Sequence, residues 1–188
     1  ITRYDGYFTF YYDEGNDKIF LEIENLDKEF LYVNALSEGI GSNDIGLDRG
    51  QLGNTRVVKF IKAGNKLLLI QPNQYYRAIT DNIEEKKSVE QAFAKSILKG
   101  FVIKETKNGK YLVDATSFFI RDAHGVMGRL LAKKQGKYTL DRSRSAINLE
   151  RTKAFPKNVE FDVMITFKGT PKGYDISSVV PTSTSVTV

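Results

Sequence analysis

Short runs of alternating apolar and polar residues recur along almost the whole chain, and they constrain the fold more than any other feature. A period of two is typical of β-strands with one buried face. Many of the runs are also rich in β-branched and aromatic residues, which favour strands. Predicted strands are residues 7–12, 18–23, 29–34, 56–62, 66–71, 75–79, 101–105, 110–114, 117–120, 146–149, 160–168 and 176–180.

Turn sequences separate several of these strands by only a few residues. Residues 13–17 and 63–65 are short and contain glycine, and Asn108-Gly109 is a strong hairpin signal. Short links join antiparallel neighbours, because parallel strands need a long crossover. The sequence therefore predicts one mainly β domain over 1–188, with antiparallel sheets that are sandwich-like or strongly curved. The expected core residues are Phe8, Phe10, Ile19, Leu21, Val57, Leu67, Leu69, Val102, Leu112, Val163 and Ile165.

One segment, residues 83–98, predicts an α-helix packed on these sheets. Asp81 or Asn82 can cap it, and two glutamates follow in its first turn, where the helix dipole favours acidic side chains. A second, short helix is expected around residues 125–132. The apolar stripe that would turn the first helix toward the core consists of Val89, Ala92, Phe93, Ser96 and Ile97.

The glycine-rich segment, residues 39–53, lies between two predicted strands. Its five glycines allow positive φ angles and close backbone approach. The segment is too long and polar for a hairpin turn, and no βαβ unit or Gly-Lys-Ser/Thr sequence supports a phosphate-binding loop. Its aspartates also lack the spacing of an EF-hand. Long loops on a β scaffold often carry binding function. The candidate binding or interdomain residues here are Asn43, Asp44, Asp48 and Arg49.

The only histidine, His124, lies in the sequence Arg121-Asp122-Ala123-His124-Gly125. A catalytic triad would need a nucleophile beside it, and the chain has neither a Gly-x-Ser-x-Gly elbow nor a His-Glu-x-x-His helix. A turn-orienting hydrogen bond is therefore favoured over catalysis. Asp122 and His124 are candidate binding or interdomain residues, and no catalytic or metal-binding residue is predicted.

Basic residues are densest at 141–145 and 151–153. Arg142 and Arg144 are further candidates for binding or interdomain contact, because guanidinium groups form bidentate pairs with carboxylates. An internal ion-pair network is favoured over a partner surface. Expected internal partners are Asp44, Asp48, Asp114 and Asp122.

The composition narrows the classes of function. The net charge is +5, but its 28 basic and 23 acidic residues are interspersed, unlike the basic stripe of nucleic-acid-binding proteins. The absence of cysteine excludes disulfides and cysteine-based zinc sites. No apolar run approaches the roughly 20 residues of a membrane helix, so membrane insertion is not expected. The start at Ile1 leads us to expect a processed form or an excised domain.

Three stretches are similar to one bacterial family: residues 41–51, 112–126 and 138–158. They read Gly-Ser-Asn-Asp-Ile-Gly-Leu-Asp-Arg-Gly-Gln, Leu-Val-Asp-Ala-Thr-Ser-Phe-Phe-Ile-Arg-Asp-Ala-His-Gly-Val, and Tyr-Thr-Leu-Asp-Arg-Ser-Arg-Ser-Ala-Ile-Asn running into Arg-Thr-Lys-Ala-Phe-Pro-Lys-Asn. They resemble the domain of unknown function N-terminal to the catalytic domain in large bacterial zinc-dependent metalloproteases. The resemblance extends from about Gly6 to the end of the chain.

This resemblance implies a non-catalytic accessory domain whose partner is the catalytic metallopeptidase domain of the same polypeptide. Zinc is then expected in that catalytic domain and no cofactor in this chain, and the location is exported, either periplasmic or at the cell surface. Peptide substrate is a further expected contact, if the domain lines the catalytic cleft. Two alternatives stay open: an autonomous secreted β-sandwich module that binds peptide or glycan, and an inhibitory, prodomain-like segment. The absence of tryptophan argues mildly against stacking on glycans.

Overall fold

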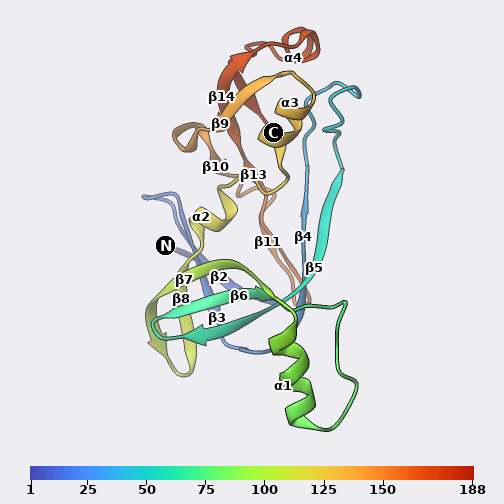
Figure 1. Cartoon of the computed structure of the whole chain (residues 1–188). Helices are drawn as coiled ribbons and strands as arrows, with labels where there is room; N and C mark the ends of the chain where they lie inside the picture. The colour runs from blue at the N-terminus through green and yellow to red at the C-terminus, as the bar shows by residue number, and fades with distance from the viewer. The chain divides into compact units, whose positions relative to one another are not determined.

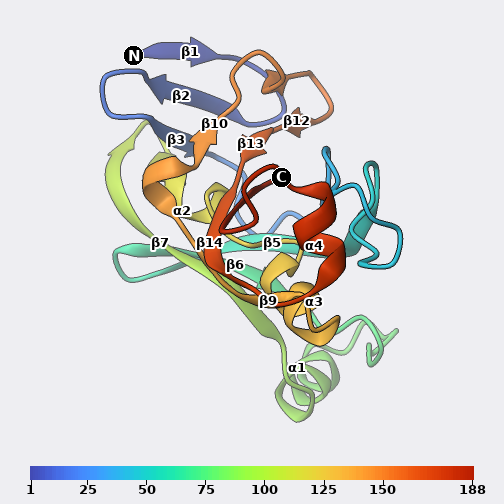
Figure 2. The ribbon, with the colours of Figure 1, turned by 90° about the horizontal axis from the view of Figure 1, so that it is seen from above.

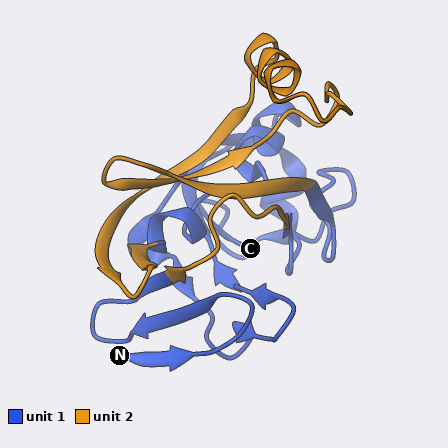
Figure 3. Ribbon diagram, turned by 90° about the horizontal axis from the view of Figure 1, so that it is seen from below, with its two compact units in different colours: residues 1–21, 33–54, 115–188 blue, residues 22–32, 55–114 orange.

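The computed structural model describes all residues, 1–188, and it is mainly β with antiparallel strands, which confirms the predicted fold class (Figure 1). Its largest sheet has eight strands in the order β1-β2-β3-β8-β7-β6-β5-β4. Two compact units divide the chain (Figure 3). Unit 1 comprises Ile1–Leu21, Val33–Asn54 and Ala115–Val188, and unit 2 comprises Glu22–Tyr32 and Thr55–Asp114.

Unit 2 is built on a meander of antiparallel strands. Its strands are most of β5 (Leu52–Ala63), then β6 (Lys66–Gln71), β7 (Ser96–Lys107) and β8 (Lys110–Asp114). Two of the predicted hairpin turns lie here. Gly64 has φ +58°, and Asn108 and Gly109 have φ +52° and +75°, as a type I′ turn requires. The buried side chains of this unit are Ile23, Val58, Phe60, Leu67, Leu69, Ile70, Phe101 and Val113.

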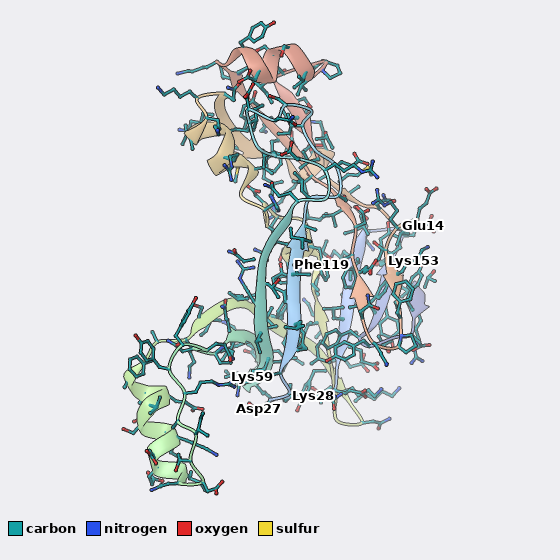
Figure 4. The ribbon with its side chains drawn as sticks, turned by 90° about the vertical axis from the view of Figure 1, so that its right-hand side faces the viewer. Glu14, Asp27, Lys28, Lys59, Phe119 and Lys153 are labelled. Atoms are coloured by element: carbon teal, nitrogen blue, oxygen red, sulfur yellow. The ribbon has the colours of Figure 1, made fainter.

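An ion pair fixes the turn that precedes β4 (Phe30–Ala35). Asp27 has a positive φ of 58°, and its backbone N–H donates to the carbonyl of Phe60 at 2.8 Å. Its carboxylate lies 3.3 Å from Nζ of Lys59, and the two side chains point toward each other in Figure 4. The turn is therefore tied to the neighbouring strand by both backbone and side chain.

The predicted long helix is shorter than its sequence pattern suggests. Helix α1 spans Ile83–Ala92, begins as predicted with Asn82 as its cap, and buries no residue. Residues 96–98 belong to β7, where Ile97 pairs with Ile70. The prediction of a helix to residue 98 with a core-facing stripe is thus wrong, because pairing with β6 overrides local helix propensity. Phe93 is 36% exposed and is not a core anchor.

Unit 1 combines short strands and helices from both ends of the chain. It holds β1 (Thr2–Tyr4), β2 (Thr9–Asp13), most of β3 (Lys18–Ile23), α2 (Thr116–Phe119), α3 (Val126–Ala132), β9 (Gly136–Leu140), the 3₁₀ turn η1 (Arg142–Arg144), β10 (Ala146–Ile147), β11 (Lys153–Ala154), β12 (Val159–Glu160), β13 (Val163–Met164), β14 (Thr166–Pro171), α4 (Tyr174–Val179) and β15 (Ser185–Thr187). Strands β15, β14 and β9 form a three-stranded sheet, whose β9 and β14 lie beside α3 and α4 in Figure 2. Helix α3 confirms the expected second helix.

Hydrogen bonds tie the first residues of unit 1 to its last third. The N–H of Ala115 donates to the carbonyl of Ile19 at 2.9 Å, and the N–H of Ile19 donates to Oγ1 of Thr116 at 3.0 Å. The N–H of Tyr7 donates to the carbonyl of Phe155 at 2.7 Å. Each bond joins residues about a hundred or more positions apart, so unit 1 is held together by non-local pairing.

A row of aromatic rings reinforces this junction within unit 1. The ring of Tyr4 stacks on Phe10 at 4.5 Å, and Phe10 meets Phe161 edge-on at 5.0 Å. Phe161 in turn stacks on Phe119 at 4.0 Å, and Phe119 contacts Phe118 at 5.5 Å (Phe119 is labelled in Figure 4). Such pairs contribute about 0.5–1.5 kcal/mol each beyond their buried area.

The predicted core residues differ in whether they lie on the buried face of their strands. Phe10, Ile19, Leu21, Leu67, Leu69 and Ile165 are buried as predicted. Phe8, Val57, Leu112 and Val163 are only half-buried, and Val102 is 49% exposed. Their neighbours Val58, Phe101 and Val113 are buried instead, because a shift of one residue exchanges the two faces of a strand. The predicted strands at 117–120 and 176–180 are the helices α2 and α4, and residues 75–79 are a loop.

We predict that Tyr12→Phe destabilises the chain by about 0.5–1.5 kcal/mol. The Tyr12 hydroxyl is buried and donates to Asp17 at 2.9 Å, and burial followed by that hydrogen bond raises the pKa of Tyr12 to about 12. A raised pKa favours the neutral phenol in the fold. The associated stability is therefore present below pH 10 and is lost as the pH rises toward 12.

Spectrophotometric titration of the tyrosines and urea unfolding measure both effects. Tyr75→Phe is the control, because Tyr75 is 93% exposed. Equal loss of stability in the two variants would contradict the prediction.

Candidate functional site

The glycine-rich segment closes on itself at its base. The N–H of Leu36 donates to the carbonyl of Gln51 at 2.9 Å, and the N–H of Gly50 donates to the carbonyl of Leu36 at 2.8 Å. Further along, the N–H of Ile40 donates to the carbonyl of Leu47 at 3.0 Å. The segment is therefore a compact loop with its ends together, of the kind that packs on its own side chains.

Buried apolar side chains anchor this loop to unit 1. Ile45 and Leu47 are 0% and 1% exposed, and Ile40 is 7% exposed. Gly39 permits the close crossing of the two halves, because a Cβ there would lie 2.7 Å from the backbone N of Arg49. The loop is thus held by packing and backbone bonds rather than left free in solvent.

The four polar residues predicted from the loop all lie on its outside. Asn43, Asp44, Asp48 and Arg49 are exposed. Along the loop, the buried Ile45 and Leu47 lie between the exposed pair Asn43 and Asp44 and the exposed pair Asp48 and Arg49. All four candidates are therefore exposed on the same loop, with both signs of charge present.

His124 ties the base of the loop to the turn that precedes α3. The side-chain amide of Asn34 lies 3.3 Å from Nδ1 of His124, and Nε2 lies 3.0 Å from Oε1 of Gln51. Since the amide group of Asn34 donates, Nδ1 accepts and the proton sits on Nε2, which donates to Gln51. Gly53 leaves space for the side chain of Asn34, because a Cβ there would overlap its Nδ2. The predicted turn-orienting role of His124 agrees with these contacts.

Asp122 caps the start of α3. Its carboxylate accepts hydrogen bonds from the backbone N–H groups of Gly125, Val126 and Met127, at 2.9, 2.8 and 2.9 Å. These donors are among those that a helix start leaves without intrahelical partners. The carboxylate faces this turn, and no contact joins it to a ring nitrogen of His124.

The two candidate arginines are bound within unit 1, and not to the expected partners. Arg142 donates to the carbonyl of Ile120 at 2.8 Å. Arg144 pairs with Asp141 at 3.0 Å and donates to Oγ of Ser185 at 2.9 Å. The expected pairing of these arginines with Asp44, Asp48, Asp114 or Asp122 is wrong. Asp141 follows β9 directly and caps η1, so Arg144 pairs with an aspartate only three residues away, a local partner that the sequence analysis did not consider.

Asp141 is the most heavily bonded carboxylate of this network. It accepts hydrogen bonds from the N–H and hydroxyl of Ser143 at 3.1 and 2.6 Å. These bonds, followed by the pair with Arg144, hold the pKa of Asp141 below its usual value. Beside it, Ser145 donates to the carbonyl of Asp141 and accepts from the N–H of Thr166 at 2.9 Å. The basic stretch therefore stabilises η1 and its junction with β14.

Gln135 organises a second polar centre that sequence analysis missed. Its side chain is buried, Oε1 accepts from the N–H of Ile176 at 3.0 Å, and Nε2 donates to Asp175 at 2.9 Å. Gly173 makes room for it, since a Cβ there would overlap Oε1. No motif marks this glutamine in the sequence, because its role depends on contacts forty residues away.

The structure contains no group of three or more histidine, cysteine or acidic side chains placed to hold a metal ion. None of its helices has both the length and the apolar character that would let it cross a membrane. What the geometry offers is a fixed loop with an exposed polar surface, whose base is joined through Gln51 to His124 in the turn that Asp122 caps.

Gly39→Ala should destabilise the chain by about 1–3 kcal/mol, because the new methyl group meets backbone atoms of Leu47 and Arg49 that have little freedom to move. Gly128→Ala is the matched control. Gly128 lies within α3 with open space around it, so alanine there should stabilise by up to about 1 kcal/mol. Chemical denaturation compares the two, and a neutral Gly39→Ala would show that the loop is not tightly closed.

A double-mutant cycle tests the link between His124 and the base of the loop. His124→Ala and Gln51→Ala should each destabilise by about 1 kcal/mol and should show a coupling energy of about 0.5–1.5 kcal/mol, since they remove the same hydrogen bond. Amide exchange of Gly50 and Gln51 should accelerate in both variants. Additive effects would mean that the contact at 3.0 Å contributes no stability.

Comparison with known families places the glycine-rich segment at the boundary between two family matches. The family described as domain of unknown function DUF5118 matches residues 2–39, and that described as domain of unknown function DUF5117 matches residues 50–188. The loop between them, 40–49, is the one just described. No curated protein and no solved structure matches the chain significantly. Since the second match covers most of the sequence, the chain belongs to the DUF5117 family of domains of unknown function.

Proposed function

We propose that this chain is a non-catalytic accessory domain of an exported bacterial zinc metallopeptidase. It packs on the catalytic domain of the same polypeptide and contributes to a wall of the substrate cleft. The observation that carries the proposal is the glycine-rich segment, which buries Ile45 and Leu47 and exposes Asp44, Asp48 and Arg49.

A loop of this kind suits an interdomain contact. Its backbone is already closed by hydrogen bonds, so docking requires little further ordering. Interfaces between domains of one chain are more polar than obligate protein interfaces. The exposed side chains of the loop supply both signs within a few residues.

Peptidase activity of the parent catalytic region tests the proposal, with this chain fused, absent or added separately. Activity should fall without the chain and return in the fused form. In the fused form, replacing Asp44, Asp48 and Arg49 by alanine should lower kcat/KM about tenfold. This corresponds to a loss of about 1.4 kcal/mol of transition-state stabilisation, shared by three polar contacts. Glu14→Ala with Lys153→Ala is the control, because both side chains are exposed on other parts of unit 1 (Figure 4).

Two results would overturn the proposal in favour of an alternative. Activity that rises without the chain and falls when it is added back identifies an inhibitory segment. Activity that is indifferent to all three arrangements favours an autonomous binding module, which titration of the isolated chain with peptides and oligosaccharides would then test.

A further inference from the structure

The connection between β6 and β7 forms an arm, residues 72–95, that carries α1. The arm is ordered by its own contacts. The ring of Tyr76 stacks on Phe93 at 3.9 Å with 6° between the planes, and the amide of Asn73 donates to the carbonyl of Ala94 at 3.2 Å. Asn82 caps α1 by accepting from the N–H groups of its first turn. The arm therefore has a defined shape although no residue of α1 is buried (Figure 1).

Large apolar side chains are exposed on this arm. Ile79 is 101% exposed, Tyr75 93% and Ile83 66%, with Tyr76 and Phe93 partly exposed beside them. A cluster of such residues on one element marks an interaction surface, and aromatic residues are enriched at such surfaces. What distinguishes this surface is the order of residues along one face of α1.

That face reads Ile83, Lys86, Glu90, Phe93. At 100° per residue Ile83, Lys86 and Glu90 fall on one side of α1, and Phe93, the C-cap residue with an extended backbone, follows at the end of that side. The order is apolar, basic, acidic, apolar, and it is symmetric about Ser88. Lys86 and Glu90 are both exposed, and the ion pair that α1 does contain joins Lys87 to Glu84 at 3.2 Å instead. A lysine that precedes a glutamate by four residues is also the weaker orientation for pairing within a helix.

We propose that α1 is a self-association surface on which two copies of this chain pair antiparallel, about a two-fold axis that crosses this face at the level of Ser88 along the helix. In that arrangement Ile83 of each copy packs on Phe93 of the other, and Lys86 of each copy pairs with Glu90 of the other. A two-fold interface uses the same patch twice, so it needs a self-complementary order of this kind.

The charge of the arm fits a second copy as its occupant. Arg77, Lys86, Lys87 and Lys95 balance Asp81, Glu84, Glu85 and Glu90, so the arm is neutral within a chain of net charge +5. Two arms can therefore meet without net repulsion. Ile83 and Phe93 are the apolar contacts of this pairing, so the interface is smaller than the roughly 1,200–2,000 Å² of stable protein interfaces. The dimer is accordingly weak and forms at high concentration.

Sedimentation of the 188-residue chain over a concentration series tests the proposal. A dimer should form by about 0.1 mM, and Lys86→Glu or Glu90→Lys should each raise its dissociation constant about tenfold, since each places like charges opposite each other twice. The two single variants mixed together should form a heterodimer, because one copy then presents two acids and the other two bases. Lys104→Glu is the matched control: it changes the net charge equally on an exposed position of β7.

Circular dichroism measures the helix content of each variant and so separates effects on association from effects on helix stability. The double variant with both substitutions has the stronger orientation for pairing within the helix. It should dimerise like the original chain. The proposal is overturned if the chain stays monomeric up to about 0.5 mM. It is equally overturned if the single variants dimerise unchanged, or if their mixture does not associate.

Discussion

The hydrogen bonds between Ile19 and the Ala115–Thr116 corner are the contact on which unit 1 depends. They join the start of β3 to the start of α2, and the aromatic row from Tyr4 to Phe118 continues the same junction. Neither side could bury its rings alone. The candidate site is supported on this unit, since the glycine-rich segment and the His124 turn belong to the segments that it assembles.

Local chemistry determined the parts of the fold that were predictable. Asn108-Gly109 makes its hairpin because two successive positive φ angles are needed there and these residues tolerate them. Asn82 begins α1 for an equally local reason, as its side chain satisfies helix N–H groups. The end of α1 was not predictable, because Ser96 and Ile97 pair with a strand that lies more than twenty residues earlier. Where pairing with a distant strand determines the secondary structure, the periodicity of one segment is insufficient to predict it.

The candidate site was likewise predictable in its local features and unpredictable in its long-range contacts. The loop composition indicated which side chains would be exposed, since Asn43, Asp44, Asp48 and Arg49 are too polar to bury without partners. The contacts that support the loop could not be predicted from the sequence. Asn34 and Gln51 reach His124 from positions 90 and 73 residues away. The partner of Arg144 is different, because Asp141 lies only three residues before it and was overlooked in favour of more distant aspartates. Glycine-rich composition favoured a mobile loop as readily as a packed one, and only the burial of Ile45 and Leu47 separates the two.

The three-part composition of unit 1 has a consequence for how the chain acquires its structure. Ile165 and Val188 exchange backbone hydrogen bonds at 2.8 and 3.0 Å, and Tyr7 is bonded to Phe155 at 2.7 Å. A pairing over a separation like that of Tyr7 and Phe155 slows folding, because loop closure precedes the contacts that reward it. Strands β1 and β2 therefore cannot complete their packing, and Tyr4 and Phe10 stay exposed to solvent, until more than 150 residues have been synthesised. Folding of this unit is a late, concerted event, and a nascent chain shorter than this needs protection from aggregation.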